Sequence, residues 1–406
     1  MRFNDGGRAA KPRVLVLTPR YPYPVIGGDR LRIYEMCKKL ALEFDLTLLS
    51  LCDQPSEMVS PMPTDGVFKA IHRVWLPKWR SYLNSALAIV TGRPLQVAYY
   101  KSDAFRKKIE ALLPEHDLVL AHLLRTGDYV KDVKIPSVVE MTDAISMNYS
   151  RLKSVGGPFG FRSLVYSLEH RRLHAYEKSS IHHHELLTFV SSVDAQYLYG
   201  SPYPENVFVC GNGVDTGHLQ FGKPEKRAQV VAFIGNMVSL QNQDAAFWFA
   251  SEILPLLRQH GDFVFRIVGQ ITDKGRSKFA GLPGVEVTGK VDSVADSVRD
   301  CFAGVCTVRI GAGVQNKLLE YMALGLPAVT TSVGLEGLGA RDGEDLYVAD
   351  TPQAFCLQLL RLWNDQSEAQ RLATNARQYV ESHHTWGAML SPLVDRIKTL
   401  ANAATV

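Results

Sequence analysis

One stretch of the sequence, RIGAGVQNKLLE, combines charged side chains with glycines in a way that favours phosphate binding. An apolar strand ends near Arg309, a turn containing Gly313 follows, and a predicted helix carries Lys317 and Glu320. Peptide N–H groups at a helix start, next to Arg and Lys side chains, form a cradle for a diphosphate. Glu320 lies on the helix face of Lys317, so its carboxylate either accepts ribose hydroxyls beside that cradle or only pairs with Lys317.

A glycine pair, Gly27 and Gly28, follows the first apolar run of the chain, RVLVLT. Glycines before a helix let the backbone approach a ligand closely, although the pair is equally compatible with a simple turn. Because the Gly-x-Gly-x-x-Gly spacing is absent, a nicotinamide or flavin cofactor is not expected. The helix should begin near Asp29, and its expected apolar face contains Leu31, Tyr34, Met36, Leu40 and Leu42.

The other reactive residue types form no metal or disulfide pattern. Six cysteines are scattered without a Cys-x-x-Cys pair, which favours reduced thiols in a cytosolic protein. The sequence contains no Asp-x-Asp motif, so we expect neither a metal nor another cofactor. No acid pair lies at convergent strand ends, as a two-carboxylate glycosidase would require.

Length and composition describe an ordinary folded protein of more than one domain. The chain has 406 residues, of which 46% are hydrophobic and 21% charged, and this excludes a disordered or fibrous protein. Its net charge of +4 is too small to indicate a nucleic-acid partner. The polar start, residues 1–11, and the absence of a long apolar run predict neither a signal peptide nor a membrane-spanning helix.

The charge is distributed unevenly along the chain. Residues 1–200 carry a net charge of +7, and the remaining residues carry −3. Within the basic part, residues 75–83 (WLPKWRSYL) combine Trp and Tyr with Lys and Arg. This composition fits either contact with an anionic membrane surface or a solvated basic face over an ordinary core.

Apolar runs alternate with helical patterns throughout the chain, which predicts an α/β protein with parallel, doubly wound sheets. The expected strands are 13–18, 45–51, 117–121, 137–140 and 186–190 in the first part, and 230–234, 263–268, 285–288, 305–308 and 327–331 in the second. The segment GSPYPEN near residue 200 indicates a domain boundary. We predict a first domain over 1–200, a second over 201–385, and a final helix over 386–406 that crosses back to the first domain.

Several motifs resemble those of the retaining glycosyltransferases of family 4, which have the GT-B fold. The family's Glu-Ala-Met-Ala-x-Gly-x-Pro signature is matched by Glu320, Tyr321, Met322, Ala323, Gly325 and Pro327. An Asn-Gly-Val-Asp motif lies at 212–215. The resemblance covers nearly the whole chain, is closest to bacterial exopolysaccharide-type sugar transferases, and implies two Rossmann-like domains that face a central cleft.

The residue patterns and the resemblance together suggest a set of site residues. Those expected to act in catalysis are His122, near the transferred sugar, Lys317, and Glu320, which would grip the nucleotide ribose. Those expected to bind the donor are Gly27, Gly28, Gly235, Asn236, Arg309, Gly313, Val314, Gln315, Asn316, Lys317 and Glu320. Asp143, Ser146 and Tyr149 follow a strand end in the basic part and are expected on the acceptor side.

Two departures from the family pattern affect these expectations. Ala312 replaces the first glutamate of the family's paired-glutamate motif, so a carboxylate that would hold donor-sugar hydroxyls is missing. Asn236 and Gln241 stand where the family has an Arg and a Lys after the first strand of the second domain. We therefore expect Arg309 and Lys317 to neutralise the diphosphate of the leaving nucleotide.

The expected activity is transfer of a hexosyl group from a nucleoside-diphosphate sugar, with UDP favoured over GDP, to a polysaccharide or lipid-linked oligosaccharide, with retention. One alternative is a catalytically silent GT-B subunit that activates a partner transferase, which the alanine at 312 would favour. A second alternative is a nucleotide-sugar epimerase on the same fold. The expected location is the cytoplasm, with peripheral attachment of the basic part to the inner face of the cell membrane as an option.

Overall fold

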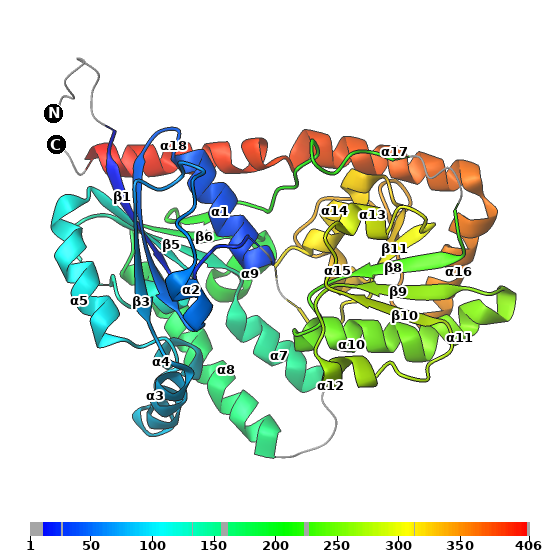
Figure 1. The fold of residues 1–406 in the computed structure, drawn as a ribbon, viewed down its shortest axis with the longest axis horizontal. Helices are drawn as coiled ribbons and strands as arrows, with labels where there is room; N and C mark the ends of the chain where they lie inside the picture. The colour runs from blue at the N-terminus through cyan, green and yellow to red at the C-terminus, as the bar shows by residue number, and fades with distance from the viewer. Residues whose placement is uncertain are drawn as a thin grey trace. The chain divides into compact units, whose positions relative to one another are not determined.

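The computed structural model describes residues 11–25, 27–131, 133–155, 161–222, 227–311 and 313–403 (Figure 1). The chain divides into two units, one formed by Met1–Cys210 with Leu390–Val406 and the other by Gly211–Met389. The predicted boundaries, after residues 200 and 385, lie ten and four residues before these. Within the described ranges, no helix is both long and apolar enough to span a membrane.

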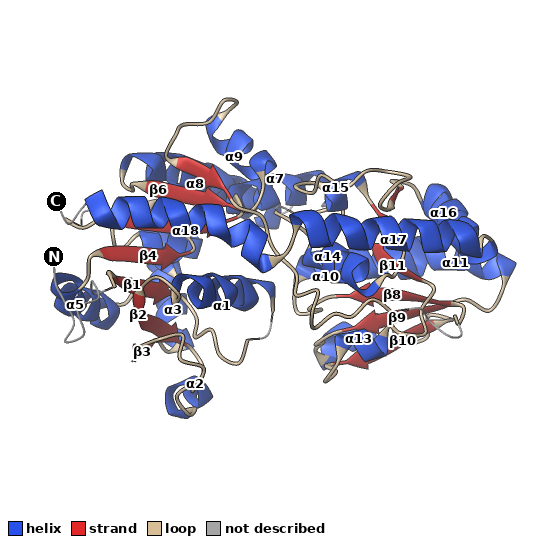
Figure 2. Cartoon of the chain, turned by 90° about the horizontal axis from the view of Figure 1, so that it is seen from above, coloured by secondary structure: helices blue, strands red, loops and turns tan. Residues whose placement is uncertain are grey.

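The first unit is built on a seven-stranded parallel sheet with the order β3-β2-β1-β4-β5-β6-β7. Figure 2 shows β3, β2, β1, β4 and β6 in this order. Its strands are β1 (Arg13–Thr18), β2 (Asp45–Cys52), β3 (Ala70–Trp75), β4 (Leu118–His122), β5 (Ser137–Thr142), β6 (Leu186–Phe189) and β7 (Val207–Val209). Strands β4 and β6 are buried over their whole length, as expected of strands that helices cover on both faces.

The helices of this unit fill the connections between parallel strands, which need a crossover. They are α1 (Gly28–Leu40), α2 (Pro55–Val59), α3 (Lys78–Thr91), α4 (Leu95–Ala98), α5 (Asp103–Leu112), α6 (Leu124–Gly127), α7 (Ile145–Val155), α8 (Phe161–Ser179) and α9 (Ser192–Tyr199). Helix α18 (Trp386–Ala403) belongs to this unit from Leu390 onward. Its Lys398 ammonium lies 2.8 Å from the carboxylate of Glu43.

Helix α1 brings a charged residue into the core. Its buried residues are Arg32, Ile33, Met36, Cys37 and Leu40. Met36 and Leu40 belong to the predicted apolar face, and their burial confirms the prediction for these two residues. The prediction for Leu42 was wrong, because the helix ends at Leu40 and the Leu42 side chain is 63% exposed.

The second unit contains a six-stranded parallel sheet with the order β10-β9-β8-β11-β12-β13. Its strands are β8 (Val230–Ile234), β9 (Val264–Val268), β10 (Val285–Gly289), β11 (Ala303–Cys306), β12 (Ala328–Thr330) and β13 (Tyr347–Val348). Its helices are α10 (Leu240–Trp248), α11 (Leu254–Leu257), α12 (Asp273–Ser277), α13 (Val294–Ser297), α14 (Asn316–Leu324), α15 (Ser332–Leu335), α16 (Pro352–Asn364) and α17 (Gln366–His383). The predicted pair of doubly wound parallel sheets is therefore confirmed.

Both sheets reverse their strand order beside their first strand in the chain. From β1 the chain proceeds through β2 to β3 in one direction, and β4 to β7 lie on the other side. The second sheet repeats this arrangement around β8, with β9 and β10 on one side and β11 on the other. Ligands of open α/β sheets bind at the carboxyl ends of strands beside such a reversal. The residues that follow β1, β4, β8 and β11 are therefore the ones positioned to form sites.

Tyr321 fastens α14 to this edge of the second sheet. Its ring lies against Gly304 of β11, where an added Cβ would come within 2.7 Å of the ring, so only glycine fits. The phenol oxygen accepts a hydrogen bond of 2.8 Å from the backbone N–H of Ile234, the last residue of β8. The hydroxyl lies 3.2 Å from the carbonyl oxygen of Val305, to which it can donate. One side chain thus links two strands and the helix at the carboxyl edge.

Replacing Tyr321 with Phe should lower the free energy of unfolding of the second unit by about 1–3 kcal/mol, because the buried N–H of Ile234 loses its acceptor. Denaturant unfolding followed by circular dichroism measures the change. Tyr82→Phe, on an exposed ring of the first unit, is the matched control and should leave stability unchanged. Equal stability of Tyr321→Phe and wild type would contradict this role.

Candidate functional site

The glycine-rich turn after β11 leads directly into α14. Gly311, Gly313 and Val314 are buried in it, and Gly313 has a φ of +71°. Gln315 is the N-cap residue of α14, and no side chain caps the helix. Among the described residues, the first peptide N–H groups of α14 therefore have no side-chain acceptor, which is the usual arrangement at an anion-binding helix start. Ala312 lies outside the described residues.

Lys317 supplies a buried positive charge beside this turn. Its side chain is 8% exposed, and its ammonium donates to the amide oxygens of Asn242 at 3.1 Å and Gln315 at 3.3 Å. The ammonium also lies 5.1 Å from the centre of the Phe233 ring. It forms no ion pair with any carboxylate of the described ranges. A buried cation held only by neutral groups favours binding of an anion, because burial without a counter-charge is costly.

A chain of amide groups connects Lys317 to the end of β8. The Asn242 side chain, which accepts from Lys317, donates to the carbonyl oxygen of Asn236 at 3.0 Å. Asn236 is exposed and follows Gly235, and its own side chain accepts from the N–H of Val238 at 3.1 Å. The structure therefore brings the predicted residues Gly235, Asn236 and Lys317 into one connected region, with Asn242 as a linking residue that sequence reasoning missed.

Glu320 lies one helical turn beyond Lys317 and is half-buried. Burial raises the pKa of its carboxyl group to about 7, and the neighbouring Lys317 charge lowers this pKa only in part. Throughout the described part of the chain, no group donates a hydrogen bond to this carboxylate or forms an ion pair with it. The structure therefore does not contain the Glu320–Lys317 ion pair that was one of the two alternatives.

Arg309 has a different environment from Lys317. Its guanidinium contacts the Asp244 carboxylate of α10 at 2.8 and 3.3 Å. It also lies 5.0 Å from the centre of the Trp248 ring. A diphosphate would therefore have to share this guanidinium with Asp244. Of the two predicted cations, Lys317 is the one without a carboxylate partner among the described residues.

Asn316 connects the start of α14 to the Asn-Gly-Val-Asp motif. Its side-chain oxygen accepts a hydrogen bond of 2.7 Å from the Asn212 side chain. The Asn212 carbonyl in turn lies 3.0 Å from Nδ1 of His384, and the Val214 N–H donates to the His384 carbonyl at 2.7 Å. The motif thus joins the glycine-rich turn to the end of α17.

A hollow of about 1330 Å³ lies at the other edge of the second sheet. Its lining includes Arg227, Cys301 and Leu326, which come just before β8, β11 and β12. These positions are the amino ends of parallel strands, so this hollow is separate from the glycine-rich turn.

In the first unit, the predicted glycine pair forms the start of α1. Gly27 is the N-cap residue, its φ is +97°, and its carbonyl oxygen accepts from the N–H of Leu31 at 2.9 Å. Gly28 is the first helical residue, and both glycines are exposed. A positive φ favours glycine at position 27. The exposed backbone at this helix start remains open to a ligand.

His122, at the carboxyl end of β4, belongs to a buried charge network. Its Nδ1 atom lies 2.7 Å from Oε2 of Glu140, and the Arg32 guanidinium lies 2.7 Å from Oε1 of the same carboxylate. Burial alone raises the pKa of Glu140, but the Arg32 charge and the His122 hydrogen bond outweigh burial and lower this pKa to about 2. Because an ionised carboxylate only accepts, Nδ1 of His122 carries the hydrogen. The contact with Glu140 leaves the Nε2 atom of His122 available for another hydrogen bond.

Strained backbone surrounds the Glu140 carboxylate. Thr142, at the end of β5, has a φ of +64°, and its hydroxyl contacts both Glu140 oxygens at 2.9 and 3.0 Å. Leu123, directly after His122, has a φ of +66°, and its N–H donates to the Glu140 carbonyl at 2.7 Å. Positive φ values are rare for Thr and Leu and concentrate at functional sites.

The three residues predicted on the acceptor side lie in different surroundings. Ser146 is fully buried, and its N–H faces the Glu177 carboxylate of α8 at 3.3 Å. The Tyr149 hydroxyl accepts from the Gln96 side chain at 3.2 Å. Burial raises the pKa of Asp143, against the charge of Arg125, and its carboxylate accepts from Asn148 at 3.3 Å. Asp143 and Ser146 thus both interact with Glu177, whereas the Tyr149 hydroxyl contacts Gln96.

Arg32 and Glu140 are the charged residues that sequence reasoning missed. Both stand inside apolar patterns, Glu140 within SVVEMT and Arg32 on the buried face of α1. A carboxylate inside a buried parallel strand needs a partner, and this signal in the sequence could have identified Glu140.

Replacing Glu140 with Gln should destabilise the protein by about 3 kcal/mol at neutral pH, because Arg32 stays buried without its counter-charge. The lowered pKa of Glu140 adds to the free energy of unfolding at pH values above 4.5, which is the ordinary pKa of a glutamate. This contribution is lost as the pH falls from 4.5 toward 2. Denaturant unfolding at several pH values should therefore give a difference from wild type that shrinks across this window. A constant difference at all pH values would contradict the ion pair.

A family match lies within the unit that contains the glycine-rich turn. Residues 228–365 match the family described as Glycosyl transferases group 1. An uncharacterized 44.6 kDa protein in the cps region of Klebsiella pneumoniae is 23% identical over 163 residues. The aligned part is 38% of this chain and 42% of that protein's length.

Solved structures resemble the chain over nearly its whole length. Sucrose-phosphate synthase from Thermosynechococcus elongatus has a TM-score of 0.74 at 12% identity and covers 96% of this chain and 100% of its own. Anabaena HepE, solved in complex with UDP and glucose, has a TM-score of 0.67 at 13% identity and covers 95% of this chain and 99% of its own. At these identities the structures establish the fold. The whole chain therefore has the GT-B fold, and the match to the group 1 glycosyltransferases extends over residues 228–365.

Proposed function

We propose that this chain transfers a hexosyl group from a UDP-sugar to a polysaccharide or lipid-linked oligosaccharide acceptor, with retention. One observation carries the proposal. Helix α14 follows a glycine-rich turn and presents a buried ammonium, Lys317, and a half-buried carboxylate, Glu320, neither of which forms an ion pair with any residue that the structure describes. A nucleoside diphosphate carries both complements, phosphate for the cation and ribose hydroxyls for the carboxylate.

The proposed role of Lys317 is to stabilise the leaving group. When the bond between sugar and diphosphate breaks, negative charge grows on the phosphate that leaves. A preformed cation and helix-start N–H groups in a desolvated site stabilise that charge without reorganisation. The same phosphate oxygen would then accept the proton of the attacking acceptor hydroxyl, which is the route to retention.

The proposed role of Glu320 is to hold the ribose. Two hydroxyls of a ribose can donate to one carboxylate, and such hydrogen bonds are stronger when the acceptor is ionised. Their formation would compensate the burial that raises the pKa of Glu320. Gly235, Asn236 and Val314 to Asn316 would complete the donor site through backbone and amide groups.

The residues of the first unit are proposed to serve the sugar and the acceptor. His122 would present Nε2 to the transferred sugar, with Nδ1 fixed by Glu140. The exposed start of α1 at Gly27 and Gly28 would face the donor. Asp143 and Tyr149 remain candidates on the acceptor side, whereas Ser146 would need to leave its buried position.

The comparisons support the choice of donor and acceptor. HepE was solved with UDP and glucose, which favours a UDP-sugar for this chain. The relative in the cps region favours a role in polysaccharide synthesis. Such an acceptor is consistent with the proposed location in the cytoplasm, at the inner face of the cell membrane.

The two alternatives predict different outcomes in one assay. A silent partner subunit would bind a nucleotide sugar without releasing nucleotide, and an epimerase would convert the sugar while it remains attached. Incubation of the purified protein with UDP-, GDP- and dTDP-sugars, with analysis of free nucleotide and sugar configuration, distinguishes the three. The proposal predicts slow release of UDP from a UDP-hexose and faster release with an acceptor.

Lys317→Ala should reduce the rate of UDP release per bound donor by about 100-fold or more, because the leaving phosphate loses its cation. Arg299→Ala is the control, since Arg299 is an exposed cation at the amino edge of the same sheet. Equal loss in both variants, or no loss in Lys317→Ala, would refute the assignment of Lys317.

The affinity for UDP-glucose should increase as the pH rises through about 7, by up to about tenfold per pH unit below that value, because the ionised form of Glu320 binds the ribose. UDP-glucose suits this test since its diphosphate diester does not titrate near neutral pH. Isothermal titration calorimetry should give weaker binding with no such pH dependence for Glu320→Gln. A parallel pH dependence in the variant and in wild type would assign the titration to another group.

A further inference from the structure

Helix α3 of the first unit presents apolar side chains to solvent. Only Ser81 and Ala88 are buried along its 14 residues. The large exposed side chains of α3 are Trp79, Tyr82, Leu83, Leu87, Ile89 and Val90, with exposed fractions between 51% and 88%. An ordinary surface helix has the opposite arrangement, with the apolar stripe against the core.

The exposed apolar residues form one continuous face of α3. At about 100° per residue they cover an arc of roughly 160°, centred near Trp79 and Val90. Lys78 and Arg80 lie at the two edges of this arc, and Ser81 and Ala88 lie opposite its centre. We call the arc with its two basic edges the α3 face.

Polar contacts hold α3 in place, and one of them uses the α3 face: the Arg80 guanidinium at its edge lies 3.3 Å from the Asp103 carboxylate of α5. The Asn84 side chain donates to the carbonyl oxygen of Lys101 at 2.9 Å. Arg172 of α8 donates to the carbonyls of Ala88 and Ile89 at 3.4 and 3.1 Å. Gly92 ends the helix in a left-handed conformation. Tyr82 also packs edge to face against the Tyr99 ring, with centroids 5.9 Å apart, whereas the aliphatic side chains of the face stay exposed.

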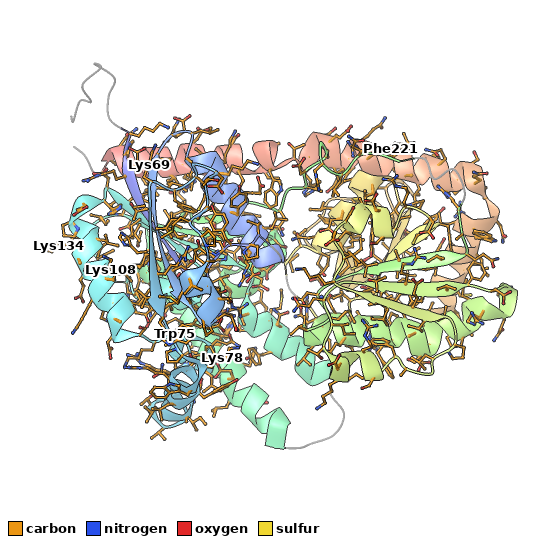
Figure 3. The ribbon with its side chains drawn as sticks, in the orientation of Figure 1. Lys69, Trp75, Lys78, Lys108, Lys134 and Phe221 are labelled. Carbon is orange, nitrogen blue, oxygen red and sulfur yellow. The ribbon has the colours of Figure 1, made fainter. Side chains whose placement is uncertain are left out.

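We infer that the α3 face docks the first unit onto an anionic lipid bilayer. Residues 75–94 contain Lys78, Arg80 and Arg93 and no acidic residue. Apolar side chains would enter the boundary between headgroups and acyl chains, while Lys and Arg at the edges would reach the phosphates. Trp75, 40% exposed, lies with Lys78 where α3 begins (Figure 3) and adds a second Trp of the kind enriched at membrane interfaces.

The charges favour a bilayer over a second copy of this chain. Pairing two α3 faces would bring basic edges together without an acidic residue on either helix; Asp103 of α5 pairs with Arg80, and the Lys78 edge has no ion pair with the described residues. Like charges at an interface cost affinity and oppose such pairing. An anionic bilayer supplies the missing negative charge together with an apolar layer.

This inference rests on the proposed function only in that a bilayer would carry a lipid-linked acceptor. Vesicle binding needs neither donor nor transfer, so it can be tested while the donor site is unoccupied. Absence of vesicle binding would leave nucleotide binding by the second unit unaffected, and absence of nucleotide binding would leave this test valid.

The experiment is co-sedimentation of the full chain with vesicles of phosphatidylcholine alone or mixed with phosphatidylglycerol. Wild type should bind the anionic vesicles and bind less at high salt. Replacing Leu83 and Val90 together with Glu should weaken binding about tenfold or more, because two apolar side chains are lost and like charge is added. Leu357→Glu, on an exposed leucine of α16 in the second unit, is the matched control and should bind like wild type.

Circular dichroism of the double variant should match wild type, because both altered side chains are exposed in the folded chain. Absence of binding to anionic vesicles would overturn the inference, and so would an equal loss of binding in the double variant and the Leu357→Glu control. A third contrary result would be a wild-type dimer, detected by light scattering, that the double variant does not form. The last result would assign the α3 face to a second copy.

Discussion

The carboxylate of Glu140 lies in the interior of the first unit, where three polar side chains reach it: the Arg32 guanidinium, the His122 ring and the Thr142 hydroxyl. A buried carboxylate is tolerated only when its partners are complete, so each of these groups is constrained in position. The constraint joins α1, β4 and β5 at the carboxyl edge of the sheet. It fixes the histidine proposed to act on the sugar and holds two residues at positive φ beside it.

The second unit also buries a charged side chain, but there no carboxylate among the described residues pairs with it. Lys317 is also buried at a carboxyl sheet edge, but its partners are amide oxygens, and its charge is not neutralised. Arg309 illustrates the contrast, because Asp244 already compensates it. An incomplete electrostatic environment in a folded protein is destabilising by itself, and a ligand of complementary charge relieves it. The proposed donor site is therefore a place where the described residues supply no ion-pair partner for a buried cation.

Much of the architecture was predictable because buried parallel strands have a plain apolar signature. β1 and β8 agree with their predicted bounds, whereas β11 begins two residues before its prediction. β3 was missed because its half-buried sequence, AIHRVW, lacks that signature. In the site, the glycine-rich turn and Lys317 were predictable from local spacing. The Arg32–Glu140 pair and the Asn242–Lys317 contact were not, because their partners are 108 and 75 residues apart in the chain and only the tertiary fold joins them.

A crystal structure of this chain with UDP-glucose tests the central claim most directly. The account predicts that the diphosphate lies against the N–H groups at the start of α14 with the Lys317 ammonium in contact, and that the ribose hydroxyls donate to Glu320. A nucleotide bound elsewhere on the second unit, or one whose phosphates contact neither Lys317 nor the glycine-rich turn, would contradict it.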